Sequence, residues 1–219
     1  MTGGAVKGQS SARNWGLAVV AVMLATMTVW DVAAQSKGTP APPAPDKTMG
    51  QKTAPITMEV FSDYQCPACR DLYFQTLRPV IENYVNTGKV YLIHRDMPLP
   101  SHQHSRLAAR YANAAATLNR LEKVTLALYE KQHLWSADGN VEAVVAAVLS
   151  PAEMRRARQL VDGGQLEPHI NSDVTRGNTK RVRSTPTTLI TYQGQEVPVV
   201  GVVPYSMMRQ FLDQLLSKR

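Results

Sequence analysis

Residues 61–69, with the sequence FSDYQCPAC, decide the fold of this chain. They contain both of its cysteines, Cys66 and Cys69, and they continue a short apolar run that begins at residue 56. A run of this kind predicts a buried strand at 56–62. Pro67 suits the first position of a helix, because the N–H that proline lacks would have no partner within the helix there. The stretch therefore predicts a strand, a turn and a helix that starts between the two cysteines.

The residues after this turn complete a β-α-β unit. Apolar residues recur at helical spacing up to a stop signal near Gly88, namely Leu72, Tyr73, Leu77, Val80, Ile81 and Tyr84. The run KVYLIHR at 89–95 then predicts a second strand. Two strands joined by a helix pair in parallel through a right-handed crossover.

A helical segment covers about residues 101–181, and within it Ser150 and Glu153 form a capping box. Runs at 187–192 and 196–200, separated by Gln193-Gly194, then predict a hairpin, and Pro204 opens a final helix. The order is β-α-β, helical insertion, β-β-α. We therefore predict an α/β, thioredoxin-like fold with a four-stranded mixed sheet and the insertion after the second strand.

The spacing of the two cysteines points to chemistry. A disulfide between Cys66 and Cys69 closes almost no loop, so it would stabilise the chain little. As the residue before the first helical position, Cys66 faces unpaired N–H groups and the positive end of the helix dipole, which favour its thiolate. Cys69 lies one turn further on, on the same side. We expect Cys66 to be the nucleophile and the more exposed of the two cysteines, and Cys69 to resolve the mixed disulfide.

Three other interpretations of this pair stay open. The cysteines could form an inert local disulfide, or belong to a non-catalytic binding module in which Cys66 is buried and unreactive. They could also bind a metal ion in a chaperone, with a histidine such as His102 or His104 completing the site. Zinc sites usually need four ligands, however, and no second Cys-x-x-Cys exists in the chain. We therefore predict no metal.

The N-terminal part indicates export. Lys7 and Arg13 precede an apolar run at 15–30, and the small residue Ala34 fits a cleavage site, so residues 1–35 are predicted to be a signal peptide or an N-terminal membrane anchor. Residues 36–55 are rich in proline and predict an extended linker. The domain is then 56–219. We expect an extracytoplasmic location, in the periplasm or on the outer face of the cytoplasmic membrane.

The formal net charge is +7, with a basic cluster at Arg176, Lys180, Arg181 and Arg183. A charge run of this kind is typical of a solvated helix face and loop. No nucleic-acid motif or interleaved aromatic residues accompany it, so we expect no nucleic-acid partner.

Several segments together resemble the DsbA-like thiol–disulfide oxidoreductase family. The residues that carry the resemblance are the turn FSDYQCPAC at 61–69, STPT at 184–187, HRDMPL at 94–99 and GVVPY at 201–205. The resemblance spans residues 56–217. It implies that Thr185 offers its backbone to an extended substrate and that Pro186 is cis and abuts the cysteines. It also places Pro67 and Ala68 at the substrate contact.

The resemblance further implies an exported dithiol–disulfide oxidase that acts on reduced secreted proteins. A membrane quinone-linked thiol oxidase would reoxidise it, the chain would be a monomer, and no cofactor is needed. A disulfide reductase or isomerase is the alternative with the same chemistry.

Two positions depart from the family pattern. Strongly oxidising members often have histidine before the second cysteine, where Ala68 offers the thiolate neither charge nor hydrogen bond. Members also often carry a buried acid where this chain has Val60. The neighbouring Glu59 is a candidate proton shuttle, but a shift of one residue in a strand reverses its face. A strand-edge acid is the competing interpretation.

Overall fold

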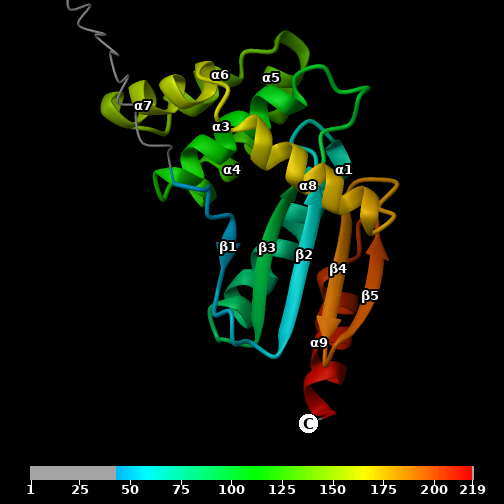
Figure 1. The fold of residues 1–219 in the computed structure, drawn as a ribbon. Coiled ribbons are helices and arrows are strands. Elements are labelled where there is room, and N and C mark those ends of the chain that lie inside the picture. Colours follow the sequence, from blue (N-terminus) through cyan, green and yellow to red (C-terminus); the bar gives the residue numbers. More distant parts are fainter. Residues whose placement is uncertain (1–42, 219) are drawn as a thin grey trace, which may run out of the picture. The chain divides into compact units, whose positions relative to one another are not determined.

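The computed structural model describes residues 43–218 of the chain. The predicted signal peptide or anchor, residues 1–35, and the first part of the predicted linker lie outside the described residues. The strands are β1 (Thr48–Met49), β2 (Ile56–Ser62), β3 (Val90–Asp96), β4 (Thr187–Tyr192) and β5 (Gln195–Val200). They form one sheet in the order β1-β3-β2-β4-β5 (Figure 1). The parallel pairing of β2 with β3 and the antiparallel hairpin of β4 and β5 confirm the predicted topology.

The sheet has five strands, so the prediction of four was wrong. The extra strand, β1, pairs antiparallel with β3 and comes from the segment predicted to be a linker. Lys47 just before it is only 7% exposed and forms ion pairs with Asp96 and Asp173. The linker was predicted from amino-acid composition, which does not record strand pairing or buried ion pairs. These two kinds of contact hold residues 46–49 against the domain.

The first helical stretch runs from Pro67 to Val85, as its apolar spacing predicts. It alternates α-helical turns, α1 (Pro67–Leu72) and α2 (Arg78–Val80), with π-helical turns, η1 (Tyr73–Leu77) and η2 (Ile81–Val85). Pro79 lies in its interior and has no N–H to donate, which disrupts the regular hydrogen-bond ladder around it. The stretch connects β2 to β3 and so completes the β-α-β unit.

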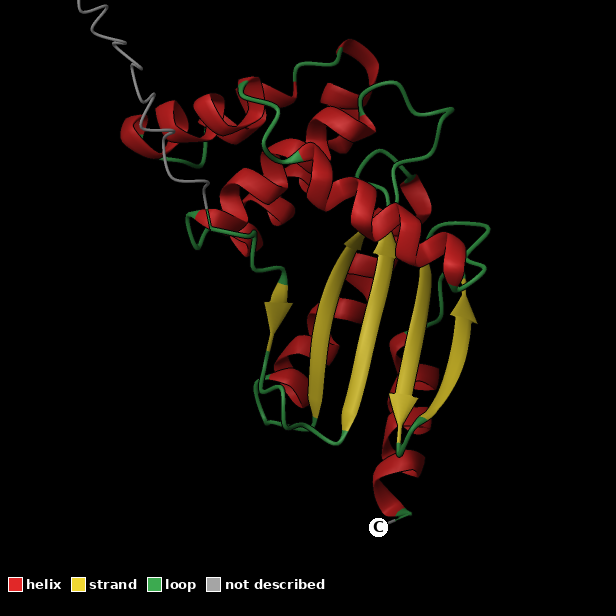
Figure 2. Cartoon of the chain, viewed as in Figure 1, coloured by secondary structure: helices red, strands yellow, loops and turns green. Residues whose placement is uncertain are grey.

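Six helices form the insertion, which confirms its predicted place between the second strand and the hairpin. They are α3 (Ser105–Thr117), α4 (Leu121–Glu130), α5 (Gln132–Asp138), α6 (Val141–Ala146), α7 (Pro151–Asp162) and α8 (Glu167–Thr179). The capping box of Ser150 and Glu153 begins α7 as predicted. Figure 2 shows these helices gathered beyond the carboxyl ends of β2 and β3. No helix within residues 43–218 has the length and apolar character of a membrane span.

Helices cover both faces of the sheet. On one face, Ile56, Met58 and Val60 of β2 belong to the main core, together with the first helical stretch and α9 (Tyr205–Ser217). On the other face, Phe61 packs with Val182, Leu189 and Met97 beside α8. Successive residues of a strand point to opposite faces, so β2 divides its side chains between these two cores.

Gly177 lets α8 approach the sheet closely. A methyl group at this position would lie 3.2 Å from the ring of Phe61 and 3.0 Å from the sulfur of Met97. Both distances are tighter than most real contacts of this kind, so a side chain here would require Phe61, Met97 or α8 to shift. The glycine therefore permits the close approach of α8 to these two side chains.

Candidate active site

Cys66 lies at the N-cap of α1, in extended conformation (φ −75°, ψ 121°), and Pro67 is the first helical residue. The carbonyl of Cys66 accepts hydrogen bonds from the N–H groups of Cys69 (3.1 Å) and Arg70 (3.2 Å). Cys66 is 8% exposed and Cys69 1%. The expectations of an N-cap cysteine and of Cys66 as the more exposed of the two cysteines are both confirmed.

The surroundings shift the pKa values of the two thiols in opposite directions. A hydrogen bond from the Cys69 thiol lowers the pKa of Cys66, and the N–H groups of Cys69 and Ala68 add to this against the effect of burial, so that the pKa is about 5. Burial raises the pKa of the Cys69 thiol, and its hydrogen bond to Cys66 raises it further. Cys66 is therefore a thiolate at neutral pH when reduced, while Cys69 keeps its proton.

The loop before β4 lies against the cysteines. The Thr185–Pro186 peptide bond is cis, as the resemblance implied. The sulfur of Cys66 lies 3.6 Å from the carbonyl oxygen of Thr185, to which Cys66 donates a hydrogen bond when its thiol is protonated. The hydroxyl oxygen of Thr185 is buried and has no hydrogen-bond partner among the described residues. Pro67 is exposed and Ala68 half-buried, so both can meet a substrate docked on Cys66.

The insertion holds the turn by side chains that the sequence did not single out. Gln132, the first residue of α5, donates its amide hydrogens to the carbonyls of Tyr64 (2.8 Å) and Cys66 (2.9 Å). Gln65 donates to the carbonyl of Ser136 (3.1 Å) and accepts from the N–H of His104 (2.9 Å). Nothing in the spacing of Gln132 could have revealed this role, because 66 residues separate it from Cys66.

The carboxylate of Asp63 links the cysteine turn to the loop after β3 through hydrogen bonds. Its buried carboxylate accepts from the N–H groups of Gln65 (2.7 Å) and Leu99 (2.8 Å) and lies 2.7 Å from the Nδ1 atom of His102. Its own N–H points at the sulfur of Cys69, at 3.4 Å. The position of Asp63 in a turn was a signal for the Gln65 contact, because aspartate commonly bonds the backbone two residues on. His102 is engaged with Asp63, and no cluster of three potential metal ligands occurs within residues 43–218.

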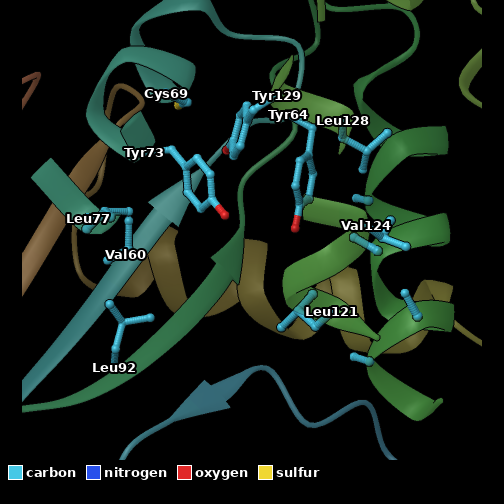
Figure 3. Close-up of a cluster of buried hydrophobic side chains, with 14 of the residues drawn as sticks. Val60, Tyr64, Cys69, Tyr73, Leu77, Leu92, Leu121, Val124, Leu128 and Tyr129 are labelled. Atoms are coloured by element: carbon cyan, nitrogen blue, oxygen red, sulfur yellow. The ribbon is translucent and has the colours of Figure 1, made fainter. Parts of the chain in front are cut away.

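Aromatic side chains surround Cys69 on the inner side. The rings of Tyr73 and Tyr129 lie 5.0 Å apart and those of Tyr64 and Tyr129 5.3 Å apart. Figure 3 shows Cys69 beside Tyr73 and Tyr129, above the core formed with the insertion. These rings keep water from the Cys69 sulfur, which is the physical source of its raised pKa.

Glu59 does not reach the cysteines, and the structure does not support its interpretation as a proton shuttle. Val60 belongs to the core that contains Cys69, so the preceding residue points to the opposite face. There Glu59 accepts hydrogen bonds from Arg95 (2.8 Å) and Arg176. Burial raises the pKa of its carboxyl, but these two hydrogen bonds outweigh burial and the pKa is lowered. Glu59 is a buried anion bound by two arginines, and it is not a strand-edge acid either.

A fold of this type, with an activated sulfur at a helix start and a second sulfur behind it, defines a class of protein. It is a thiol–disulfide oxidoreductase: Cys66 is positioned to exchange disulfides, and Cys69 to resolve the resulting bond.

The chain belongs to the thioredoxin family, whose model matches residues 44–200. Its architecture is that of the DsbA-like branch. It is similar to α-DsbA1 of Wolbachia pipientis, with 20% identity, a TM-score of 0.68, and coverage of 79% of this chain and 92% of that one. It is also similar to oxidised BdbD of Bacillus subtilis, with 17% identity, a TM-score of 0.66, and coverage of 78% and 93%. A curated relative is the probable disulfide bond formation protein D of Bacillus cereus, 20% identical over 153 residues, which are 66% of this chain and 69% of that protein.

Proposed function

We propose that this protein is an exported oxidase that passes the Cys66–Cys69 disulfide to reduced secreted proteins. A substrate thiolate attacks the sulfur of Cys66, so that a mixed disulfide forms and Cys69 leaves with the electron pair and takes up a proton. A second substrate thiolate then attacks the substrate sulfur of the mixed disulfide. A disulfide forms in the substrate, and Cys66 leaves as the thiolate. Two electrons pass from substrate to protein, so the products are an oxidised substrate and a reduced protein.

The observation that carries the direction is the low pKa of Cys66, about 5. A thiolate that is stabilised in the reduced protein makes the disulfide a stronger oxidant. The absence of a histidine at Ala68 does not remove this effect, because the N–H groups of Cys69 and Ala68 and the Cys69 thiol supply hydrogen bonds to the sulfur. The name of the Bacillus cereus relative, a probable disulfide bond formation protein, agrees with this direction.

The remaining parts of the proposal rest on family resemblance and on the N-terminal sequence. The protein would act as a monomer outside the cytoplasm, either soluble or held by an N-terminal anchor. A membrane thiol oxidase would reoxidise Cys66 and Cys69. The cis Thr185–Pro186 segment beside Cys66 would pair with an extended stretch of substrate. Such pairing uses hydrogen bonds to the substrate backbone and depends little on its side chains.

The reduction potential tests the direction. Equilibration with glutathione buffers, read by mass spectrometry after alkylation, should give a potential above about −180 mV, toward the value of strongly oxidising relatives. A potential near about −270 mV, the range of reducing thioredoxins, would overturn the oxidase proposal in favour of a reductase. The Cys69→Ala variant should accumulate a mixed disulfide with a substrate protein that contains a disulfide, because the thiolate of Cys66 attacks that disulfide and no resolving thiol remains, whereas Cys66→Ala should form none.

A further inference from the structure

The structure separates the four members of the basic cluster into two groups. Arg176 binds Glu59, and the ammonium of Lys180 lies 2.8 Å from the carboxylate of Glu196. Arg181 and Arg183 are exposed, and neither side chain makes an ion pair or hydrogen bond with any residue that the structure describes. Two positive charges in this loop are therefore available to a partner.

The loop that carries these two arginines is held in place by its backbone. The N–H of Arg181 donates to the carbonyl of Asn178 (3.0 Å), and that of Val182 to the carbonyl of Gly177 (2.9 Å). Val182 is 3% exposed and packs beneath the loop. Arg181 has a φ of +59°, so the turn is tight. The two exposed arginines thus extend from a backbone anchored on both sides of Val182.

This position is next to the reacting sulfur. Arg183 precedes Thr185 by two residues, and two residues span at most about 7 Å. The carbonyl of Thr185 is the one that accepts from the Cys66 thiol. A substrate strand that pairs with Thr185 would therefore run past Arg183, and its side chains two to four positions from the reacting cysteine would lie within reach of a guanidinium.

Three acidic side chains of the cysteine turn, α1 and β5 already have partners of their own. Asp71, one turn beyond Cys66, lies 3.5 Å from the guanidinium of Arg70. Glu196 is paired with Lys180, and the side chain of Asp63 is fully buried. None of these three acids pairs with Arg181 or Arg183.

We propose that Arg181 and Arg183 select substrates that carry acidic residues beside the reacting cysteine. This inference rests on the proposed oxidase function and names a class of substrate for it. Complementary charge at the rim of an interface accelerates encounter and disfavours partners of like charge. An exposed ion pair changes a rate or affinity by only about 1.4- to fivefold, so the selection is a preference among substrates and leaves other substrates competent.

The test uses the oxidised full chain and three dithiol peptides that differ only in whether Glu, Gln or Lys flanks one cysteine. Disulfide formation in each peptide is followed by acid quench and chromatography. Each rate is divided by the rate of the same peptide with 2-hydroxyethyl disulfide, an uncharged disulfide, which removes the effect of the flanking residue on the peptide thiol itself. We expect the Glu peptide to react about three- to fivefold faster than the Lys peptide in low salt. The ratio should approach one in 1 M salt, where the screening length is about 3 Å.

The variant Arg181→Asn/Arg183→Gln should abolish this preference, and asparagine tolerates the left-handed backbone at residue 181. The control Arg155→Gln/Arg156→Gln removes the same charge from exposed positions of α7 and should keep the preference. Equal rates for the peptides with the unmodified protein, or a preference that survives in the loop variant, would overturn the inference but leave the oxidase proposal intact. Failure to oxidise any peptide would instead overturn the proposed function, and this inference with it.

Discussion

At the scale of single residues, the reactivity of the site lies in the contrast between two sulfurs three positions apart. Cys66 receives hydrogen bonds that lower its pKa to about 5, and Cys69 is buried among tyrosine rings that raise its pKa. The low-pKa thiol is the better leaving group in exchange, and the high-pKa thiol gains most from being bound in a disulfide again. The difference in pKa thus makes Cys66 the nucleophile and Cys69 the resolving thiol, and no charged side chain lies between them in the sequence.

This contrast predicts the pH dependence of alkylation. In the reduced protein, labelling of Cys66 by iodoacetamide should follow a titration with a midpoint of about 5, because only the thiolate reacts. Cys69 should stay unlabelled up to alkaline pH. Thiolate absorbance near 240 nm in the reduced protein, with Cys66→Ser as the control that lacks the transition, measures the same midpoint. A midpoint near about 8.5, the ordinary cysteine value, would contradict the assignment.

At the scale of elements, the site depends on α5 as much as on α1. Gln132 at the start of α5 holds two carbonyls of the cysteine turn, and this side chain is 5% exposed. The carbonyl of Cys66 also accepts two bonds within α1. The insertion thereby fixes the backbone angle at which Cys66 enters the helix, and with it the N–H groups that face the sulfur.

Replacing Gln132 with leucine should weaken the site and the fold together. Loss of two hydrogen bonds to buried carbonyls should lower the free energy of unfolding by about 1–3 kcal/mol. The turn should relax, so the pKa of Cys66 should rise and the reduction potential should fall by about 30 mV, which is a tenfold change in equilibrium constant. Urea denaturation and glutathione equilibration measure the two effects. His133→Ala, at the exposed neighbouring position, should change neither. A destabilised Gln132→Leu variant with an unchanged potential would show that the glutamine has only a structural role.

At the scale of the whole molecule, a buried ionic network joins three parts of the chain. Lys47 from the N-terminal segment binds Asp96 at the end of β3 and Asp173 in α8. Asp96 also accepts from the amide of Asn113 in α3 (2.6 Å), and Asp173 from Arg95 (3.0 Å). The network therefore ties the edge of the sheet to the insertion.

Removal of Lys47 should test how much this network contributes. Lys47→Ala leaves two buried carboxylates without their shared cation, which typically costs about 3–5 kcal/mol. We expect a decrease of this size in the free energy of unfolding, measured by chemical denaturation, while the exposed Lys52→Ala should have little effect. A loss below about 1 kcal/mol for Lys47→Ala would show that water replaces the lysine.

Acid should also destabilise the molecule through Glu59. Its pKa is lowered in the folded state from the ordinary value of 4.5, so its ionised form stabilises the fold above pH 4.5, and this contribution is lost as the pH falls through the folded pKa. Unfolding free energies measured from pH 7 to pH 3 should therefore fall below about pH 4.5. Glu59→Gln should reduce this pH dependence. If the free energy of unfolding of the variant falls just as steeply below pH 4.5, the effect belongs to other carboxyl groups.

The sequence by itself determined the elements and the reacting groups, because these depend on local properties. An apolar run, a proline after a cysteine and a second cysteine one turn on are enough to predict β2, α1 and the order of the two thiols. The capping box at Ser150 and the hairpin at Gly194 are equally local. Each signal lies within a few residues of the structure that it specifies.

Only the tertiary structure decided which polar groups meet across the chain. The segment at residues 46–49 was predicted to be part of a linker because residues 36–55 are rich in proline, yet Lys47 finds its partners 49 and 126 positions away. Glu59 lies one residue from a core position, on the opposite face of the sheet. There it forms ion pairs with Arg95 and Arg176, which the sequence did not indicate. Gln132 reaches the cysteine turn only because the insertion packs over the end of the sheet. Hydrogen bonds and ion pairs of long sequence separation form once packing brings their groups together, so no local pattern records them.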